Sequence, residues 1–214
     1  MAEAPVETRK KRVVKPPEER SKEILAAALE LFATKGFDDT TIQDIATAAG
    51  VATGTVYLYF PSKEHVLLGI HEDFHRGIEE AFGEVFAKLA ERRAAGEQVP
   101  YTETIDQVLE ALVGYSKENR RICEVIARFI PRAGVVRQAL SKDRTFVQMM
   151  AASFEHGISH GVLHTTDPEM MAYLLNAAVS ETVMNSIVYG VPPDVDRVLA
   201  AAKELFHKAL APKS

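Results

Sequence analysis

The sequence has little cysteine and no long apolar run, and both absences limit what the protein can be. Cys123 is the single cysteine among 214 residues, which rules out an internal disulfide framework and suits a reducing compartment. No run of about eighteen apolar residues is present, so we expect no membrane-spanning helix. No apolar segment follows the basic N-terminus, so we also expect no signal peptide. These features predict a cytoplasmic protein.

The balance of charge gives little support for a nucleic-acid partner. The formal net charge is −5 at pH 7, with 25 basic and 30 acidic residues. Only the segment Arg9–Lys15 (RKKRVVK) is strongly basic. We predict that residues 1–16 form a disordered basic arm, which either remains solvated or adds contacts to DNA. Overall charge therefore leaves the function open.

Strand-like alternation and internal repeats are also absent, whereas helical periodicity is present along most of the chain. A first apolar stripe begins after Glu18 and ends at the stop signal Gly36. Glycine and proline residues divide the remainder into further expected helices at 41–49, 53–59, 63–93, 101–117, 120–130, 134–160, 168–189 and 194–210. The sequence thus predicts an all-α fold, and hydrophobic residues at 47% are sufficient for its core.

Two short helices joined by a tight turn, packed on a longer first helix, indicate a helix-turn-helix near the N-terminus. Two capping boxes are candidates for the start of its second helix. The pair Thr40/Gln43 fits the pattern well, and Thr41/Asp44 is a weaker version. The third helix follows the second after only a few residues.

The segment 53–59 (TGTVYLY) is built from poor helix formers, so packing must hold it in place. Val56 shares a face with Phe60, and this face is expected to be buried. The opposite face would present hydroxyl groups, which suit base edges and phosphate oxygens. Gly54 would let the backbone approach a duplex closely. This pattern favours insertion into the major groove of DNA over a merely exposed surface.

Residues 20–68 resemble the DNA-binding domain of TetR-family transcriptional regulators. The family pattern includes a G-V-x-x-G-T-x-Y-x-x-F-x-x-K-E-x-L run, which this sequence matches at Gly50, Val51, Gly54, Thr55, Tyr57, Phe60, Lys63, Glu64 and Leu67. The upstream run AALELFATKGFDDTTIQDIATAAG is similar to the first two helices of that domain. The rest of the chain is similar only in length and in being helical.

The resemblance implies a role for each matching residue. It places Thr41 and Gln43 against a phosphate or a base edge, and Thr53, Gly54 and Thr55 in the major groove. It also implies that Tyr57 and Tyr59 reach phosphates or a thymine methyl group, and that Lys63 binds a phosphate. One position departs from the pattern, because Ala52 stands where many relatives have Ser or Thr. This departure makes Thr53 a candidate for the helix cap.

The resemblance further implies three parts: the arm 1–16, a helix-turn-helix domain 17–62, and an effector-binding and dimerisation domain 63–214. The expected protein is a ligand-responsive repressor that binds a pseudo-palindromic operator in double-stranded DNA as a homodimer. The last two helices would pair with those of a second copy through the apolar stripe Met171, Leu174, Leu175, Ala178, Val179, Val183, Ile187, Val198, Leu199, Leu205 and Phe206. A pendulum motion of residues 63–93 would couple effector binding to release of DNA. No cofactor and no enzymatic activity are implied.

The effector is predicted to be an apolar or an anionic small molecule. Phe129, Met149, Met150 and Phe154 either line a pocket or belong to the core. Asn176 interrupts an apolar helix, as a ligand contact or as an exposed or interfacial residue would. A group of arginines either receives an anion such as a coenzyme A thioester or lies on solvated helix faces. Its members are Arg120, Arg121, Arg128, Arg132, Arg137 and Arg144.

Two histidine patterns suggest metal-dependent functions as alternatives to DNA binding. His71-Glu72-Asp73-Phe74-His75 is a literal H-E-x-x-H, typical of zinc hydrolases, although a third ligand is not evident. His156, His160 and His164 recur every four residues, which suits a metal or simply the C-terminus of a helix. The sequence predicts no metal site. The rival hypotheses are therefore a metal-dependent hydrolase and an all-α binding module that does not contact DNA.

Overall fold

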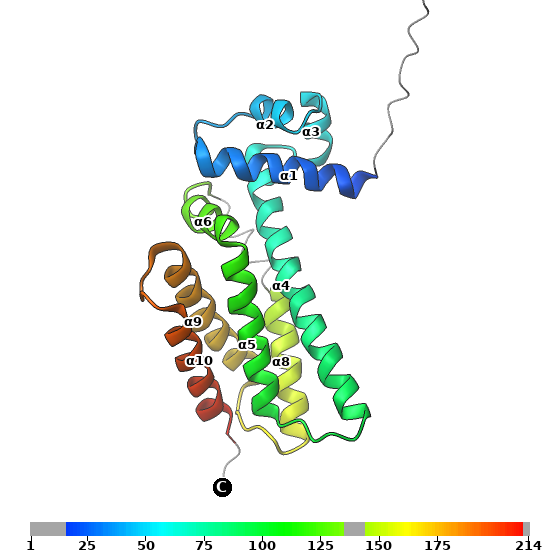
Figure 1. Ribbon diagram of the computed structural model, residues 1–214, viewed down its shortest axis with the longest axis vertical. Coiled ribbons are helices and arrows are strands. Elements are labelled where there is room, and N and C mark those ends of the chain that lie inside the picture. Colours follow the sequence, from blue (N-terminus) through cyan, green and yellow to red (C-terminus); the bar gives the residue numbers. More distant parts are fainter. Residues whose placement is uncertain (1–15, 135–143, 212–214) are drawn as a thin grey trace, which may run out of the picture.

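The computed structural model describes residues 16–134 and 144–211, and the described parts contain helices joined by turns and loops, with no strand (Figure 1). The predicted all-α fold is confirmed. The predicted arm lies outside the described residues except for Pro16, as does the first part of the helix expected at 134–160. The helices are α1 (Pro17–Thr34), α2 (Ile42–Ala48), α3 (Thr53–Tyr59), α4 (Lys63–Ala94), α5 (Tyr101–Glu118), α6 (Arg120–Phe129), α8 (Arg144–Ser159), α9 (Pro168–Tyr189) and α10 (Val195–Leu210).

Helices α1, α2 and α3 form a small bundle at one end of the molecule (Figure 1). Its core contains Ile24 and Phe32 of α1, Ile45 of α2 and Val56 of α3, all fully buried. Gly50 adopts a φ of 65° in the turn between α2 and α3, a conformation that favours glycine. The weak intrinsic propensity of α3 is thus offset by packing, because its one buried face closes this core.

Helix α4 joins the small bundle to the rest of the chain. It begins after Ser62, whose hydroxyl accepts a hydrogen bond from the His65 amide at 3.4 Å. Its 32 residues give a length of about 48 Å. Near its start, Val66 and Leu67 are fully buried, and further along Phe82 and Leu89 enter a second part of the core. One continuous helix therefore lies in both parts of the molecule (Figure 1).

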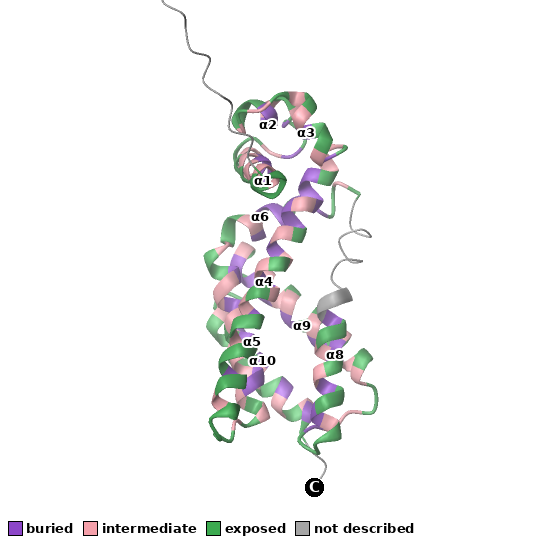
Figure 2. Cartoon of the chain, turned by 90° about the vertical axis from the view of Figure 1, so that its right-hand side faces the viewer, coloured by how far each residue is buried: buried purple, intermediate pink, exposed green. Residues whose placement is uncertain are grey.

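Helix α5 packs along the lower part of α4, α9 and α10 pack on α5, and α8 packs on α9, while α6 lies between these helices and the small bundle (Figure 1). The α6 residue Phe129 is 6.1 Å, between ring centroids, from Phe37 in the turn after α1. Buried residues follow the inner faces of the helices, while the exposed ones lie outside (Figure 2). Across the described ranges, no helix combines the length and hydropathy needed to cross a bilayer.

Candidate DNA-binding surface and effector cavity

The start of α2 is fixed by a reciprocal capping box between Thr41 and Asp44. The Asp44 amide donates to Thr41 Oγ1 at 3.1 Å, and the Thr41 amide donates to Asp44 Oδ2 at 2.9 Å. Thr40 is buried instead, and its hydroxyl donates to the Gly36 carbonyl at 2.6 Å. The preference for a Thr40/Gln43 box was therefore wrong, because the buried position of Thr40 places its hydroxyl inside the α1–α2 turn.

Asp44 also accepts a hydrogen bond from Lys35 Nζ at 2.7 Å. This hydrogen bond is the main cause that lowers the pKa of Asp44 from 3.8 to about 2, and the hydrogen bonds from Thr41 add to it. The carboxylate thus stays charged at neutral pH and holds α1 and α2 together at the exposed end of the bundle.

Helix α3 presents a polar face to solvent next to α2. Thr53 donates its hydroxyl hydrogen to Gln43 Oε1, which links the first turn of α3 to α2. Ala52 is the N-cap residue of α3 and no side chain caps it, so Thr53 does not cap this helix. Thr53 of α3 and Gln43 of α2 nevertheless lie at one surface, as the implied contacts of both residues with DNA require.

Further along α3, Tyr57 is 53% exposed and Leu58 is 84% exposed, whereas Tyr59 is half-buried. The predicted burial of Val56 and Phe60 is confirmed. Leu58 was missed by the sequence reasoning, although it lies two positions after Val56 and thus faces away from the core. Helix α3 lies at one end of the molecule (Figure 2). A large apolar side chain exposed to this degree on α3 is suited to contact a thymine methyl group.

Gly54 lies on the same exposed surface. A Cβ atom added to Gly54 would have no neighbouring atom within 4 Å, so packing inside the protein does not require a glycine there. Its φ is also not in the left-handed region. The missing side chain leaves space on the outside of α3, where a duplex would approach.

The Lys63 ammonium already has hydrogen-bond partners within the protein, whereas a phosphate contact would use a free ammonium. Its ammonium donates to the carbonyls of Phe37 at 2.5 Å and Asp38 at 3.1 Å, and it lies 4.5 Å from the centroid of the Phe37 ring. These contacts fasten the start of α4 to the α1–α2 turn. An ammonium has three donors, so one remains for a further acceptor.

A cavity of about 880 Å³ lies between α4, α5, α8 and α9, with Phe206 of α10 in its wall. Four of the five candidate ligand residues line it, namely Met149, Met150, Phe154 and Asn176. Phe129 does not line it, because this residue is buried against Phe37 where α6 contacts the small bundle. Helical periodicity identifies Phe129 and Phe154 as apolar positions, but it does not show which neighbours each side chain faces.

One end of this cavity carries polar groups. Arg93 Nη2 donates to Thr104 Oγ1 at 2.9 Å. His156 and His160 also line the cavity, with ring centroids 4.3 Å apart. Arg93 was missed because its partner, eleven positions along the chain, is set by the α4–α5 turn and not by any local motif.

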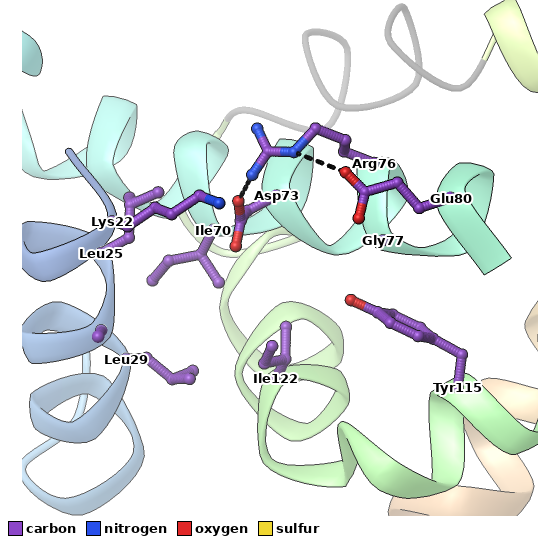
Figure 3. A pocket seen from close by; sticks show the side chains of 11 residues that line it. Lys22, Leu25, Leu29, Ile70, Asp73, Arg76, Gly77, Glu80, Tyr115 and Ile122 are labelled. Atoms are coloured by element: carbon purple, nitrogen blue, oxygen red, sulfur yellow. Dashed lines mark hydrogen bonds and ion pairs between the residues drawn. The ribbon is translucent and has the colours of Figure 1, made fainter. Parts of the chain in front are cut away.

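A second cavity of about 360 Å³ separates α1 from α4 and α5 (Figure 3). Arg76 pairs there with Asp73 and, at 3.8 Å, with Glu80. The Tyr115 hydroxyl approaches Gly77 so closely that a Cβ atom at Gly77 would overlap it. This glycine is required for the close packing of α5 on α4.

The arginine group does not form one anion site. Arg120 pairs with Glu124 at 2.8 Å and Arg121 with Glu30 at 2.8 Å. Arg137 and the side chain of Arg144 lie outside the described residues. Two of the described members, Arg120 and Arg121, thus form surface ion pairs, of which the second joins α6 to α1.

The two histidine patterns form no metal centre in the part of the chain that the structure describes, since no group of three or more possible ligands occurs there. His71 is buried, and burial lowers its pKa to about 3, with a smaller contribution from His75. His164 is separate from the His156/His160 pair, and its amide donates to the Leu210 carbonyl at 3.0 Å. A buried neutral His71 is a core residue of α4.

Two short helices joined at Gly50, with an exposed and hydroxyl-bearing second member, define a helix-turn-helix protein that binds DNA. The family model described as "Bacterial regulatory proteins, tetR family" matches residues 24–70. The HTH-type transcriptional regulator YhgD of Bacillus subtilis (strain 168) is 25% identical over 165 residues, which cover 73% of this chain and 78% of YhgD. Residues 24–70 thus form a DNA-binding domain of the kind found in TetR-family transcriptional regulators.

Solved structures share the whole fold. Thermus thermophilus FadR, a TetR-family transcriptional repressor in complex with lauroyl-CoA, is 23% identical with a TM-score of 0.66 and covers 91% of this chain and 96% of its own. A transcriptional regulator from Saccharomonospora viridis in complex with choline is 20% identical with a TM-score of 0.63, covering 92% of this chain and 100% of its own. At these identities the likeness concerns the fold, and the two ligands differ in charge.

Proposed function

We propose that the protein is a repressor that binds a pseudo-palindromic operator as a homodimer and is released from it by a small molecule. The observation that carries this proposal is the double role of α4. Val66 and Leu67 complete the core of the small bundle, and Phe82 and Phe86 of the same helix line the large cavity. A ligand that displaces α4 at the cavity therefore also moves the DNA-binding helices.

The proposed DNA contacts are those of the exposed surface of α2 and α3. Thr41 and Gln43 would contact phosphates or base edges, and Thr53, Gly54 and Thr55 would enter the major groove. Tyr57, Tyr59 and the exposed Leu58 extend this surface, and Lys63 would use its remaining donor for a phosphate. The proposed domain limits are 1–16 for the arm, 17–62 for DNA binding and 63–214 for effector binding and dimerisation.

The proposed dimer contact uses the outer faces of α9 and α10. Part of the predicted apolar stripe, including Leu175, Val179 and Phe206, is buried within the subunit. Other apolar residues remain exposed, notably Leu174 at 60% and Leu205 at 45%. A surface of this kind supports pairing with a second copy, because exposed apolar patches commonly mark interfaces.

Release from DNA follows from the geometry of two linked DNA-binding units. Tight binding needs both copies of α3 in major grooves about 34–36 Å apart, or a multiple of this distance. A small change in the direction of α4 alters this spacing. We further propose that the protein acts in the cytoplasm and is not an enzyme, which its single cysteine and the family model matched by residues 24–70 support.

Selection of the preferred DNA from a random pool, followed by band-shift titration, tests this proposal. Tyr57→Ala should weaken binding to the selected DNA at least tenfold while the dimer and the thermal unfolding temperature stay unchanged. Lys63→Ala is unsuitable for this purpose, because its carbonyl contacts stabilise the bundle. Failure to select any DNA sequence, or full binding by Tyr57→Ala, would contradict the proposal.

A further inference from the structure

The large cavity is apolar inside and at most of its rim. Phe82, Phe154 and Phe206 are almost fully buried in its walls. At its opening, Phe86, Met149 and Val162 keep 38%, 40% and 45% of their surface exposed. Because exposed apolar surface is unfavourable in water, this arrangement favours an apolar ligand that covers the opening.

The cavity is also long. Its lining residues on α4 extend from Glu79 to Arg93, a separation of fourteen positions or about 21 Å along the helix. On the antiparallel α5 they extend from Tyr101 to Leu112, or about 17 Å. A cavity that follows two helices over such lengths suits an extended chain better than a compact ring system.

Among the described lining residues, Arg93 is the one lysine or arginine, and it lies at one end of this cavity. Arg93 has Thr104 as its hydrogen-bond partner, and among the described residues no carboxylate lies within ion-pair distance of it. The preceding Arg92 is different, because it forms ion pairs with both Glu97 and Glu103, and these two carboxylates balance its positive charge. Arg93 therefore remains available for an anionic partner at the cavity.

His156 of α8 and His160, directly after the end of α8, line the cavity, and α8 ends at the same lower end of the molecule as α4 (Figure 1). The Tyr101 hydroxyl donates to the Ser153 carbonyl at 3.5 Å, which ties the beginning of α5 to α8 there. Glu79, the one acidic residue among the described residues of the lining, belongs to the opposite end. The charge distribution is thus that of an apolar channel with a cationic end.

We propose that the cavity binds an unbranched alkyl chain with an anionic head group. The chain would lie against Phe82, Phe154 and Phe206, and the head group would contact Arg93 with His156 and His160 beside it. This inference rests on the proposed function only for the regulatory meaning of the site, since the binding itself needs no DNA. A free carboxylate and a coenzyme A thioester share this chemistry.

Ligands with one chain and different head groups test the proposal on the full-length protein without DNA. Calorimetric titration should rank dodecanoate above dodecan-1-ol, and dodecan-1-ol above dodecyltrimethylammonium. Dodecanoyl-CoA separates the two anionic sources: binding tighter than that of dodecanoate identifies the thioester, and weaker binding identifies the free acid. Either result supports the proposal when dodecan-1-ol and dodecyltrimethylammonium bind more weakly than the preferred anion.

Arg93→Gln should weaken binding of the preferred anion about tenfold and leave dodecan-1-ol unaffected, because it removes one charge-assisted contact. Lys88→Gln is the matched control, since Lys88 is exposed on the same helix and does not line the cavity. Equal binding of all head groups, preference for the cation, or equal behaviour of the two variants would overturn the proposal. Operator binding is measured separately, so loss of one activity does not imply loss of the other.

Discussion

Substitution of Gly54 is expected to change the thermal stability of the protein and its affinity for the operator in opposite directions. Within the protein, a Cβ atom at this position meets nothing, and the backbone is helical. Replacing a helical glycine by alanine stabilises a protein by about 0.5–1 kcal/mol. For a chain of this size, the expected rise in the unfolding temperature is about 1–4 °C. Gly54→Met should behave similarly, because methionine is also a good helix former.

Operator binding by the same variants should change in the opposite direction. If α3 lies in the major groove with Gly54 against the duplex, an added side chain pushes the helix outward. A loss of about 1.4 kcal/mol for each copy of α3 weakens binding by about tenfold, and two copies in one dimer give about a hundredfold. The effect should be larger for Gly54→Met than for Gly54→Ala.

Thermal unfolding and band-shift titration of wild type and both variants measure the two effects together. Variants that are more stable yet bind the operator as well as wild type would refute the close approach at Gly54. Variants that are less stable would instead refute the description of α3 as open at this position.

Three further changes test individual contacts. Gly77→Ala should destabilise the fold by about 1–3 kcal/mol, because the Tyr115 ring must move, whereas Gly83→Ala on the same helix should not; equal unfolding temperatures would contradict this packing. Asp44→Asn should lower stability at neutral pH. Since the folded-state pKa of Asp44 is lowered to about 2, its contribution is present above the ordinary value of 3.8 and is lost as pH falls toward about 2, so acid titration of both proteins should converge there. Lys63→Met should lower the unfolding temperature, measured by calorimetry, because two carbonyls lose their donor; an unchanged temperature would argue against the anchoring role.

The sequence was most informative where function depends on local pattern. The segment 53–59 is a helix with Val56 buried, as its spacing predicted. The choice between Thr40 and Thr41 as cap could not be made locally, because both fit an i, i+3 pattern and tertiary burial decides between them.

Contacts between segments that are distant in the sequence were harder to predict from it. Lys63 matches a phosphate-binding position of the family, yet it contacts the Phe37 carbonyl 26 positions earlier. Phe129 and Phe154 are equally apolar in sequence, but only the second lines the cavity. Arg93 gains its place from the turn between α4 and α5. Such placements depend on the packing of whole helices, which residue spacing within one helix does not encode.

Salt dependence of operator affinity tests the central claim most directly, because only contact with phosphates releases counterions. With six to ten phosphate contacts, affinity for the selected operator should fall by about 10³–10⁵-fold between 50 and 200 mM salt. An affinity that stays constant over this range would contradict a DNA-binding role for α2 and α3.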